Sequence, residues 1–118
     1  MSDILELENQ VARFCQARDW DQFHTPKDLA IGISTEANEL LDLFRFKTES
    51  DMKSMLNDSS KRRQIEEELA DTLFFVLRFA QMNQMDLSKI LMDKLDKNEK
   101  KYPVEKSKGS NLKYTELP

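Results

Sequence analysis

The chain has 118 residues, which is enough for one domain with one hydrophobic core. It holds only 2 Gly and 3 Pro, against average usage of roughly 7% and 5%, which disfavours turn-rich β architectures and glycine-rich phosphate loops. With 18 basic and 22 acidic residues the net charge is −4, which disfavours binding to DNA or RNA.

No export or membrane signal is visible in the sequence. Residues 1–10 are acidic and lack the positive start and apolar run of a signal peptide, and no window is apolar enough to span a membrane. Because Cys15 is the single cysteine, an intrachain disulfide and a zinc site of paired cysteines are excluded. We therefore expect a cytoplasmic protein without a membrane partner or a nucleic-acid polymer as partner.

Apolar residues recur at helical spacing in the first half of the chain. We expect a first helix that is capped by Ser2 or Asp3 and runs to about Arg18. A second helix should begin after Thr25, whose hydroxyl can accept from free backbone N–H groups, and should run to about Phe46. A polar and aromatic loop joins the two.

The second half of the chain alternates polar and apolar segments. Residues 48–60 are mostly polar, and we expect a loop with one short helical turn there. A third helix is expected over about 61–83. Within it, residues 73–77 are apolar on every side, which indicates burial by more than one partner and, in so small a chain, by another subunit. A fourth helix is expected over about 87–101, ended by Pro103.

Four helices in one chain predict an all-α fold, a bundle of about four helices that oligomerises through helix packing. Residues 1–103 would form one helical domain, and residues 104–118 a polar C-terminal tail. No internal repeat and no second domain are visible.

Two acidic pairs lie where the expected helices are otherwise apolar. Glu36 and Glu39 are three residues apart in the second helix, and Glu68 and Asp71 repeat that spacing in the third, so each pair shares one helix face. Carboxylates that converge on apolar faces must be neutralised by protonation, by cations or by metal, and hard oxygen ligands suit Mg²⁺ or Mn²⁺. Nearby, Gly32 lies inside the second helix and indicates a close contact rather than a break.

Spacing alone leaves two interpretations of these acids open. The same pairs occur on solvated helices, and the run from Glu66 to Glu68 is in part a charged helix start. A di-iron bundle is disfavoured because it needs Glu-x-x-His on two helices, whereas the one histidine, His24, lies in a loop.

The motifs that contain these acids resemble those of a known family. Residues 34–40, STEANEL, followed by residues 67–71, EELAD, are similar to the ExxE and ExxD metal motif of the MazG-like nucleoside triphosphate pyrophosphohydrolases. The flanking segments 18–24, RDWDQFH, and 94–103, KLDKNEKKYP, resemble those of the small dCTP-pyrophosphatase branch. The likeness extends without gaps from about residue 14 to Pro103.

The resemblance implies an all-α catalytic domain that assembles as a homodimer or homotetramer. It implies hydrolysis of a deoxynucleoside triphosphate to the monophosphate and pyrophosphate, which depends on Mg²⁺, with Mn²⁺ as a substitute. The role it implies is nucleotide-pool house-cleaning. By motif position the catalytic and metal-ligating residues are Glu36, Glu39, Glu68 and Asp71, one of which would orient or deprotonate the attacking water.

The resemblance also implies a substrate-binding set. The nucleobase pocket maps to Trp20, His24, Phe46 and Phe75, and the phosphate side to Lys94, Asn98 and Lys101, with Tyr102 as a further substrate-binding residue. The structural alternatives are core packing for Phe46 and Phe75, and a favourable charge at a helix C-terminus for the lysines.

This chain departs from the animal members of that branch at three positions. Val11, Phe46 and Phe75 stand where those members carry a histidine, a tryptophan and a tyrosine. These differences remove polar groups that could discriminate between bases, so dCTP is the first choice while dATP and modified pyrimidine nucleotides stay open. The alternative function is a non-catalytic helical module that binds nucleotide or protein, against which the intact acidic pairs argue.

Overall fold

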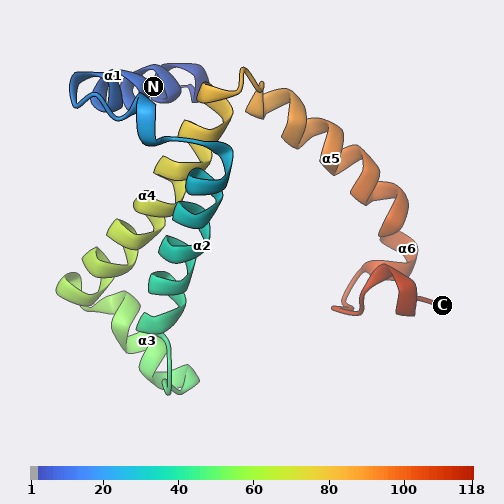
Figure 1. Ribbon diagram of the computed structural model, residues 1–118. Coiled ribbons are helices and arrows are strands. Elements are labelled where there is room, and N and C mark those ends of the chain that lie inside the picture. Colours follow the sequence, from blue (N-terminus) through green and yellow to red (C-terminus); the bar gives the residue numbers. More distant parts are fainter. Residues whose placement is uncertain (1–2) are drawn as a thin grey trace. The chain divides into compact units, whose positions relative to one another are not determined.

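The computed structural model describes residues 3–118, so Ser2, one of the two predicted helix caps, lies outside the described residues. Over that range the chain is all-α, as predicted (Figure 1). The elements are α1 (Ile4–Ala17), the 3-10 turn η1 (Asp21–Phe23), α2 (Pro26–Leu43), α3 (Glu49–Asn57), α4 (Ser59–Met82), α5 (Leu87–Lys101), α6 (Val104–Ser107) and the 3-10 turn η2 (Tyr114–Glu116). No helix among residues 3–118 is long and apolar enough to cross a membrane.

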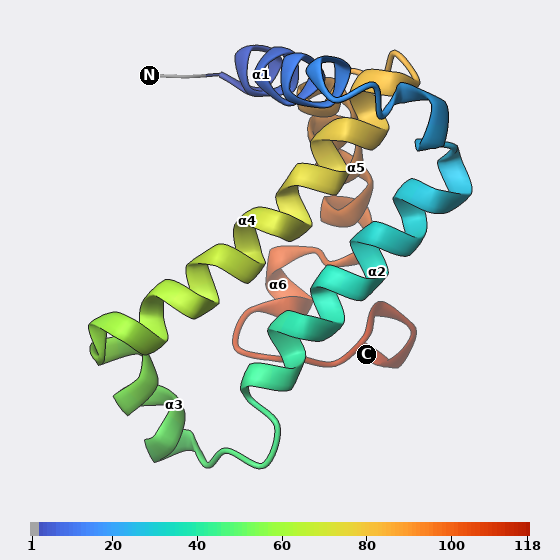
Figure 2. The ribbon, with the colours of Figure 1, turned by 60° about the vertical axis from the view of Figure 1, so that its left-hand side comes forward.

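The chain divides into two units, one up to Gln84 and one over Met85–Pro118. In the first unit, α2 and α4 lie side by side and run in opposite directions, and α3 joins them at one end (Figures 1 and 2). At the other end, α1 crosses the C-terminal part of α4. This arrangement places the middle of α2 beside the middle of α4.

The helices of the first unit begin where the sequence supplies a side-chain acceptor for free N–H groups. Asp3 accepts from the backbone of Glu6 at 2.7 Å, and Thr25 accepts from Asp28 at 3.2 Å. The predicted loop over residues 48–60 was wrong, because Thr48 opens α3. Its hydroxyl accepts from the Asp51 backbone while the Asp51 carboxylate accepts from the Thr48 backbone, a reciprocal capping box that nucleates a helix with few apolar residues.

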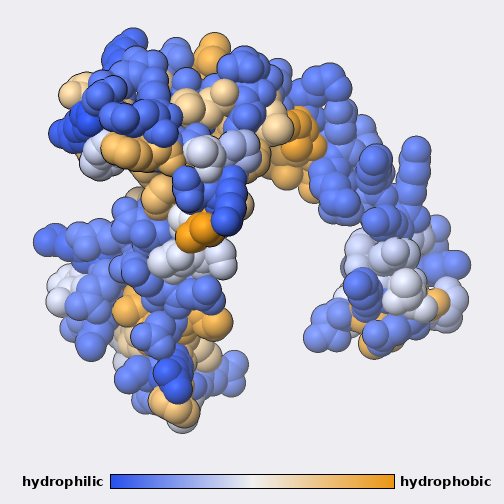
Figure 3. All heavy atoms as spheres, viewed as in Figure 1, coloured by the Kyte–Doolittle hydropathy of each residue, from blue (hydrophilic) through white to orange (hydrophobic). Residues whose placement is uncertain are grey.

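The buried core lies at the end of the first unit where α1, the start of α2 and the end of α4 meet. Its buried apolar residues are Ala12, Cys15, Leu29, Leu77 and Ala80. Farther along α4, apolar side chains are uncovered: Leu69 is 58% exposed and Leu73 is 46% exposed. Figure 3 likewise shows apolar side chains among polar ones on the outer surface of this unit. Residues 73–77 are therefore buried on one side only within the single chain.

Gly32 marks the closest approach of α2 and α4. A Cβ built at this position would lie 2.5 Å from Cδ1 of the Phe75 ring, well inside van der Waals contact. The predicted close contact at Gly32 is thus confirmed, and it seats the Phe75 ring against the backbone of α2.

We expect Gly32→Ala to lower the free energy of unfolding. Alanine gains about 1 kcal/mol of helix propensity over glycine, but the clash with Phe75 should cost more than this gain, about 2–3 kcal/mol of overpacking. Urea unfolding measures the balance. The double variant Gly32→Ala/Phe75→Ala removes the clash, so the glycine substitution should become stabilising in that background. A Gly32→Ala protein as stable as wild type would contradict the contact.

The second unit is built around α5. Asp86 caps this helix by accepting from the Lys89 backbone at 3.1 Å. Beyond it, the chain folds back, because the ring of Tyr114 meets the ring of Tyr102 edge to face at 5.9 Å between centroids. Lys101 lies over the same Tyr114 ring at 4.9 Å.

Candidate metal centre

The structure brings three of the four predicted carboxylates together. One carboxylate oxygen from each of Glu36, Glu39 and Glu68 lies within 4.8 Å of the others. Glu36 and Glu39 come from the middle of α2 and Glu68 from the facing part of α4, so the antiparallel helix pair creates the cluster. Glu36 and Glu68 are half-buried, whereas Glu39 is exposed. Asp71, one turn beyond Glu68, is exposed and lies outside this group of three.

The cluster carries negative charge without a matching cation. Burial raises the pKa of Glu36 to about 7, helped by a hydrogen bond shared with Glu39 and by the charges of Glu39, Asp71 and Glu68. Burial also raises the pKa of Glu68, again helped by a shared hydrogen bond with Glu39. Within residues 3–118, no lysine or arginine forms an ion pair with these carboxylates.

Two buried acceptors in the cluster support a cation site. The Oε2 atoms of Glu36 and Glu68 are buried and have no hydrogen-bond partner among the described residues. Unsatisfied acceptors of this kind are costly in a folded protein and call for a bound cation, water or proton. A donor set made only of carboxylate oxygens is the chemistry that hard divalent cations prefer. Glu36, Glu39 and Glu68 thus fit a Mg²⁺ or Mn²⁺ ion.

The raised pKa of Glu36 predicts how stability depends on pH in the metal-free protein. The folded state holds a proton on Glu36 up to about pH 7, whereas the unfolded chain releases it near the ordinary pKa of 4.5. The contribution of Glu36 to the free energy of unfolding is therefore fully present below pH 4.5 and is lost as the pH rises through about 7.

The measurement is the unfolding free energy of the wild type and of Glu36→Gln, both in chelator, across that pH range. The advantage of Glu36→Gln over the wild type should grow as the pH rises and then level off above pH 7. A difference that does not change with pH would contradict the raised pKa. A divalent cation that binds these carboxylates would compete with this proton, so its affinity should increase over the same pH range.

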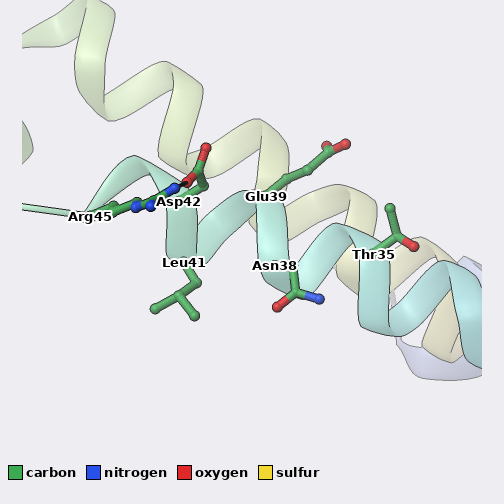
Figure 4. A pocket seen from close by; sticks show the side chains of 6 residues that line it. All are labelled: Thr35, Asn38, Glu39, Leu41, Asp42 and Arg45. Carbon is green, nitrogen blue, oxygen red and sulfur yellow. Dashed lines mark ion pairs between the residues drawn. The ribbon is translucent and has the colours of Figure 1, made fainter.

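An open pocket of about 680 Å³ adjoins the cluster on the exposed side of α2, lined by Thr35, Asn38, Glu39, Leu41, Asp42 and Arg45 (Figure 4). Glu39 belongs to both the pocket and the carboxylate cluster. Arg45 pairs with Asp42 at 3.9 Å on the surface. The other lining residues were not predicted from the sequence. The available signal was Asp42, which continues the three-residue spacing of Glu36 and Glu39 and so lies on the same side of the helix.

The predicted base-binding residues are divided between the two ends of the helix pair. Trp20 and His24 meet edge to face, with ring centroids 6.1 Å apart, in the loop before α2. Phe75 joins them through intermediate rings, namely Phe14 on Trp20 at 5.6 Å, Phe14 on Phe74 at 5.9 Å and Phe74 on Phe75 at 5.2 Å.

Phe46 does not join this aromatic row. It follows the C-terminus of α2, and that helix of 18 residues spans about 27 Å, so one chain keeps Phe46 far from Trp20 and His24. The residue is 90% exposed, and its backbone has φ 62°, a left-handed conformation that bulky residues rarely adopt. Phe46 therefore does not pack in the core of the single chain.

Arg78 on α4 is a residue of this region that the sequence analysis missed. Its side chain is fully buried and forms an ion pair with Asp21 of η1. It also donates from Nε to His24 Nδ1 at 2.9 Å and from Nη1 to Gln81 Oε1 at 2.6 Å. The available signal was an arginine inside the apolar run of the third predicted helix.

The predicted phosphate-binding residues, and Tyr102 as a further predicted substrate-binding residue, all lie in the second unit. Lys94 is exposed and Asn98 half-buried on α5, where their four-residue spacing puts them on one face. Lys101 and Tyr102 end that helix, and both contact Tyr114.

Facing helices that carry a shared carboxylate cluster define an all-α protein with a candidate divalent-cation site. The chain belongs to the MazG-like family, whose model matches residues 31–117. It is 36% identical over 118 residues to dCTP pyrophosphatase 1 of Homo sapiens and of Rattus norvegicus, which covers 100% of this chain and 68% of each relative. A solved pyrophosphatase from Archaeoglobus fulgidus superposes with a TM-score of 0.78 at 34% identity, over 87% of this chain and 94% of that one. The family and the all-α fold expected from the sequence are confirmed.

Proposed function

We propose that this chain hydrolyses a deoxynucleoside triphosphate to the monophosphate and pyrophosphate, with dCTP as the favoured substrate and nucleotide-pool house-cleaning as its role. The MazG-like family and relatives named dCTP pyrophosphatase and pyrophosphatase support a nucleoside triphosphate pyrophosphohydrolase. The observation that carries the proposal is the cluster of Glu36, Glu39 and Glu68 on facing helices.

The carboxylates hold the cation that the reaction needs. We assign Glu36, Glu39 and Glu68 as ligands of Mg²⁺, with Mn²⁺ as a substitute, and Asp71 as the fourth acid of the set. When bound, Mg²⁺ supplies charge that offsets the phosphates and lowers the pKa of a coordinated water. Glu39 is the exposed member and lines the adjoining pocket, so it is the carboxylate best placed to face the nucleotide and orient the attacking water.

The aromatic loop is the proposed base-binding end. Trp20 is 37% exposed and offers a ring face for stacking, and His24 lies beside it. Phe75 supports this end through the aromatic row, and Phe46 belongs to the base pocket only if another chain covers it. Lys94, Asn98 and Lys101 are proposed for the phosphate side, and Tyr102 as a further substrate-binding residue.

A second copy of this chain is the proposed cover for the open face of α4. Leu69, Ala70, Leu73 and Val76 line an apolar pocket of about 470 Å³ on that helix. Burying such a surface favours association through helix packing, as a homodimer or homotetramer. Light scattering of the wild type and of Leu73→Glu tests this, because the charge should shift the assembly toward monomer.

A nucleotide panel tests the activity. Each canonical deoxynucleotide, together with dUTP and 5-methyl-dCTP, is given to the purified chain with Mg²⁺, with Mn²⁺ or with chelator, and the products are separated. We expect monophosphate and pyrophosphate in equal amounts, fastest with dCTP and absent in chelator. Release of orthophosphate, or no turnover of any nucleotide, would contradict the proposal. Binding without turnover would instead favour the non-catalytic module.

A further inference from the structure

Arg78 is a fully buried cation whose contacts lie outside the carboxylate cluster. It sits on α4 and makes three polar contacts, with Asp21 and His24 of the loop before α2 and with Gln81 one turn along its own helix. Burying a guanidinium is costly unless its donors are paired, so this network has a strongly preferred geometry. Arg78 thereby fixes the position of the loop that carries Trp20 and His24.

The chemistry of the contact fixes the protonation of the imidazole. A guanidinium can only donate hydrogen bonds, so His24 Nδ1, 2.9 Å from Arg78 Nε, must be the unprotonated acceptor. A neutral imidazole with Nδ1 free carries its proton on Nε2. Burial and the Arg78 charge lower the pKa of His24, which keeps the ring neutral near pH 7.

The other ring nitrogen is left available. Among residues 3–118, no group accepts a hydrogen bond from His24 Nε2, and the side chain is only half-buried. The Trp20 ring lies against the same imidazole, with ring centroids 6.1 Å apart. One aromatic face and one hydrogen-bond donor therefore lie side by side in this loop.

We propose that Arg78 is a positioning residue that holds His24 in the Nε2–H tautomer, so that the loop presents a single donor beside Trp20 to an acceptor atom of a nucleobase. The assignment of the ligand rests on the proposed function. The tautomer itself does not, because it follows from the Arg78–His24 contact alone. The expected ligand edge is a ring nitrogen or a carbonyl oxygen, both of which cytosine carries.

The tautomer can be measured in the wild-type protein without any substitution. His24 is the one histidine of the chain, so long-range proton–nitrogen NMR at pH 7 reports a single imidazole. We expect a neutral ring protonated on Nε2. A ring protonated on Nδ1, or a charged ring, would overturn the proposal. The NMR test does not depend on activity. If the chain turned over no nucleotide, the proposed function would be wrong, but the tautomer of His24 would still be measured.

Arg78→Met tests the functional half of the proposal, with Arg62→Met as the matched control. Arg62 lies on the same helix, but its side chain is 57% exposed and pairs with Glu66 at the surface. Arg78→Met should mix the two His24 tautomers and raise the KM for dCTP by roughly three- to tenfold, the value of one neutral hydrogen bond, while kcat stays within about twofold. Arg62→Met should change neither.

A double-mutant cycle separates positioning from a general structural effect. If Arg78 acts through His24, then Arg78→Met should raise the KM no further in a His24→Ala background. Additive losses in that background, or a fall in kcat with the tautomer unchanged, would show that Arg78 only supports the fold. If Arg78→Met fails to fold, the wild-type tautomer and the KM of His24→Ala still decide the proposal: an Nδ1–H ring or an unchanged KM would overturn it.

Discussion

Glu68→Gln is expected to lower turnover by more than about 100-fold while leaving the helices intact. Substituting groups that merely support metal ligands costs roughly 10–100-fold in many metalloenzymes, so removing Glu68, which we propose as a ligand, should cost more. Glu68 is the member of the cluster that α4 contributes, and its loss leaves both remaining carboxylates on α2. The readout is kcat/KM for dCTP at saturating Mg²⁺.

The same substitution should make the metal-free protein more stable at neutral pH. Glu68 shares its site with Glu36 and Glu39, and the raised pKa values of Glu36 and Glu68 show that burial and mutual repulsion oppose their charged forms. Glutamine keeps the shape of the side chain and removes one of these charges. Thermal unfolding in chelator should therefore shift upward, whereas the stabilisation that Mg²⁺ confers on the wild type should be lost.

Glu67→Gln is the matched control for both effects. Glu67 is the neighbouring residue on α4, is exposed, and lies outside the cluster of Glu36, Glu39 and Glu68. It should keep wild-type turnover and the wild-type response to Mg²⁺. Equal losses in Glu67→Gln and Glu68→Gln would place the catalytic carboxylates elsewhere. Activity retained by Glu68→Gln would remove the metal assignment.

The sequence predicted those parts of the fold that depend on local signals. The helix starts at Asp3 and Thr25 were found because each cap is a side chain close in sequence to the N–H that it accepts from. α3 was missed because apolar periodicity is weak there, and its start depends instead on the reciprocal Thr48–Asp51 contact. Gly32 was interpreted correctly because an internal helical glycine has few other uses.

The candidate site could be predicted only in part from the sequence. The acidic spacing placed Glu36, Glu39 and Glu68 on faces that could meet, and the antiparallel helix pair brings them together. No local pattern could show that Arg78 reaches the loop before α2, because 54 residues separate it from His24. Long-range pairing of polar groups depends on how the helices pack, and hydrophobic periodicity carries no record of it.

We expect the loss of Asp21 to destabilise the chain more than the loss of its ion-pair partner Arg78. Asp21→Ala should destabilise the chain by about 2–4 kcal/mol, because it leaves a fully buried guanidinium with only the neutral acceptors of His24 and Gln81. The loss should be smaller than for a fully buried ion pair, because the Asp21 side chain is 48% exposed and water can replace part of the lost contact. Arg78→Met should cost less, because the aspartate left behind can rehydrate.

The decisive measurement is the double variant Asp21→Ala/Arg78→Met. Replacing both members of a buried ion pair by apolar groups is often neutral, so adding Arg78→Met to Asp21→Ala should restore part of the lost stability in urea unfolding. Asp42→Ala is the control, since its pair with Arg45 is at least 67% exposed on both sides and should be worth less than about 1 kcal/mol. A double variant less stable than Asp21→Ala alone would mean that Arg78 contributes through packing of its stem rather than through its charge. If the double variant is more stable than Asp21→Ala, the loss caused by Asp21→Ala comes from the unpaired charge of Arg78. The same charged side chain holds His24 in place.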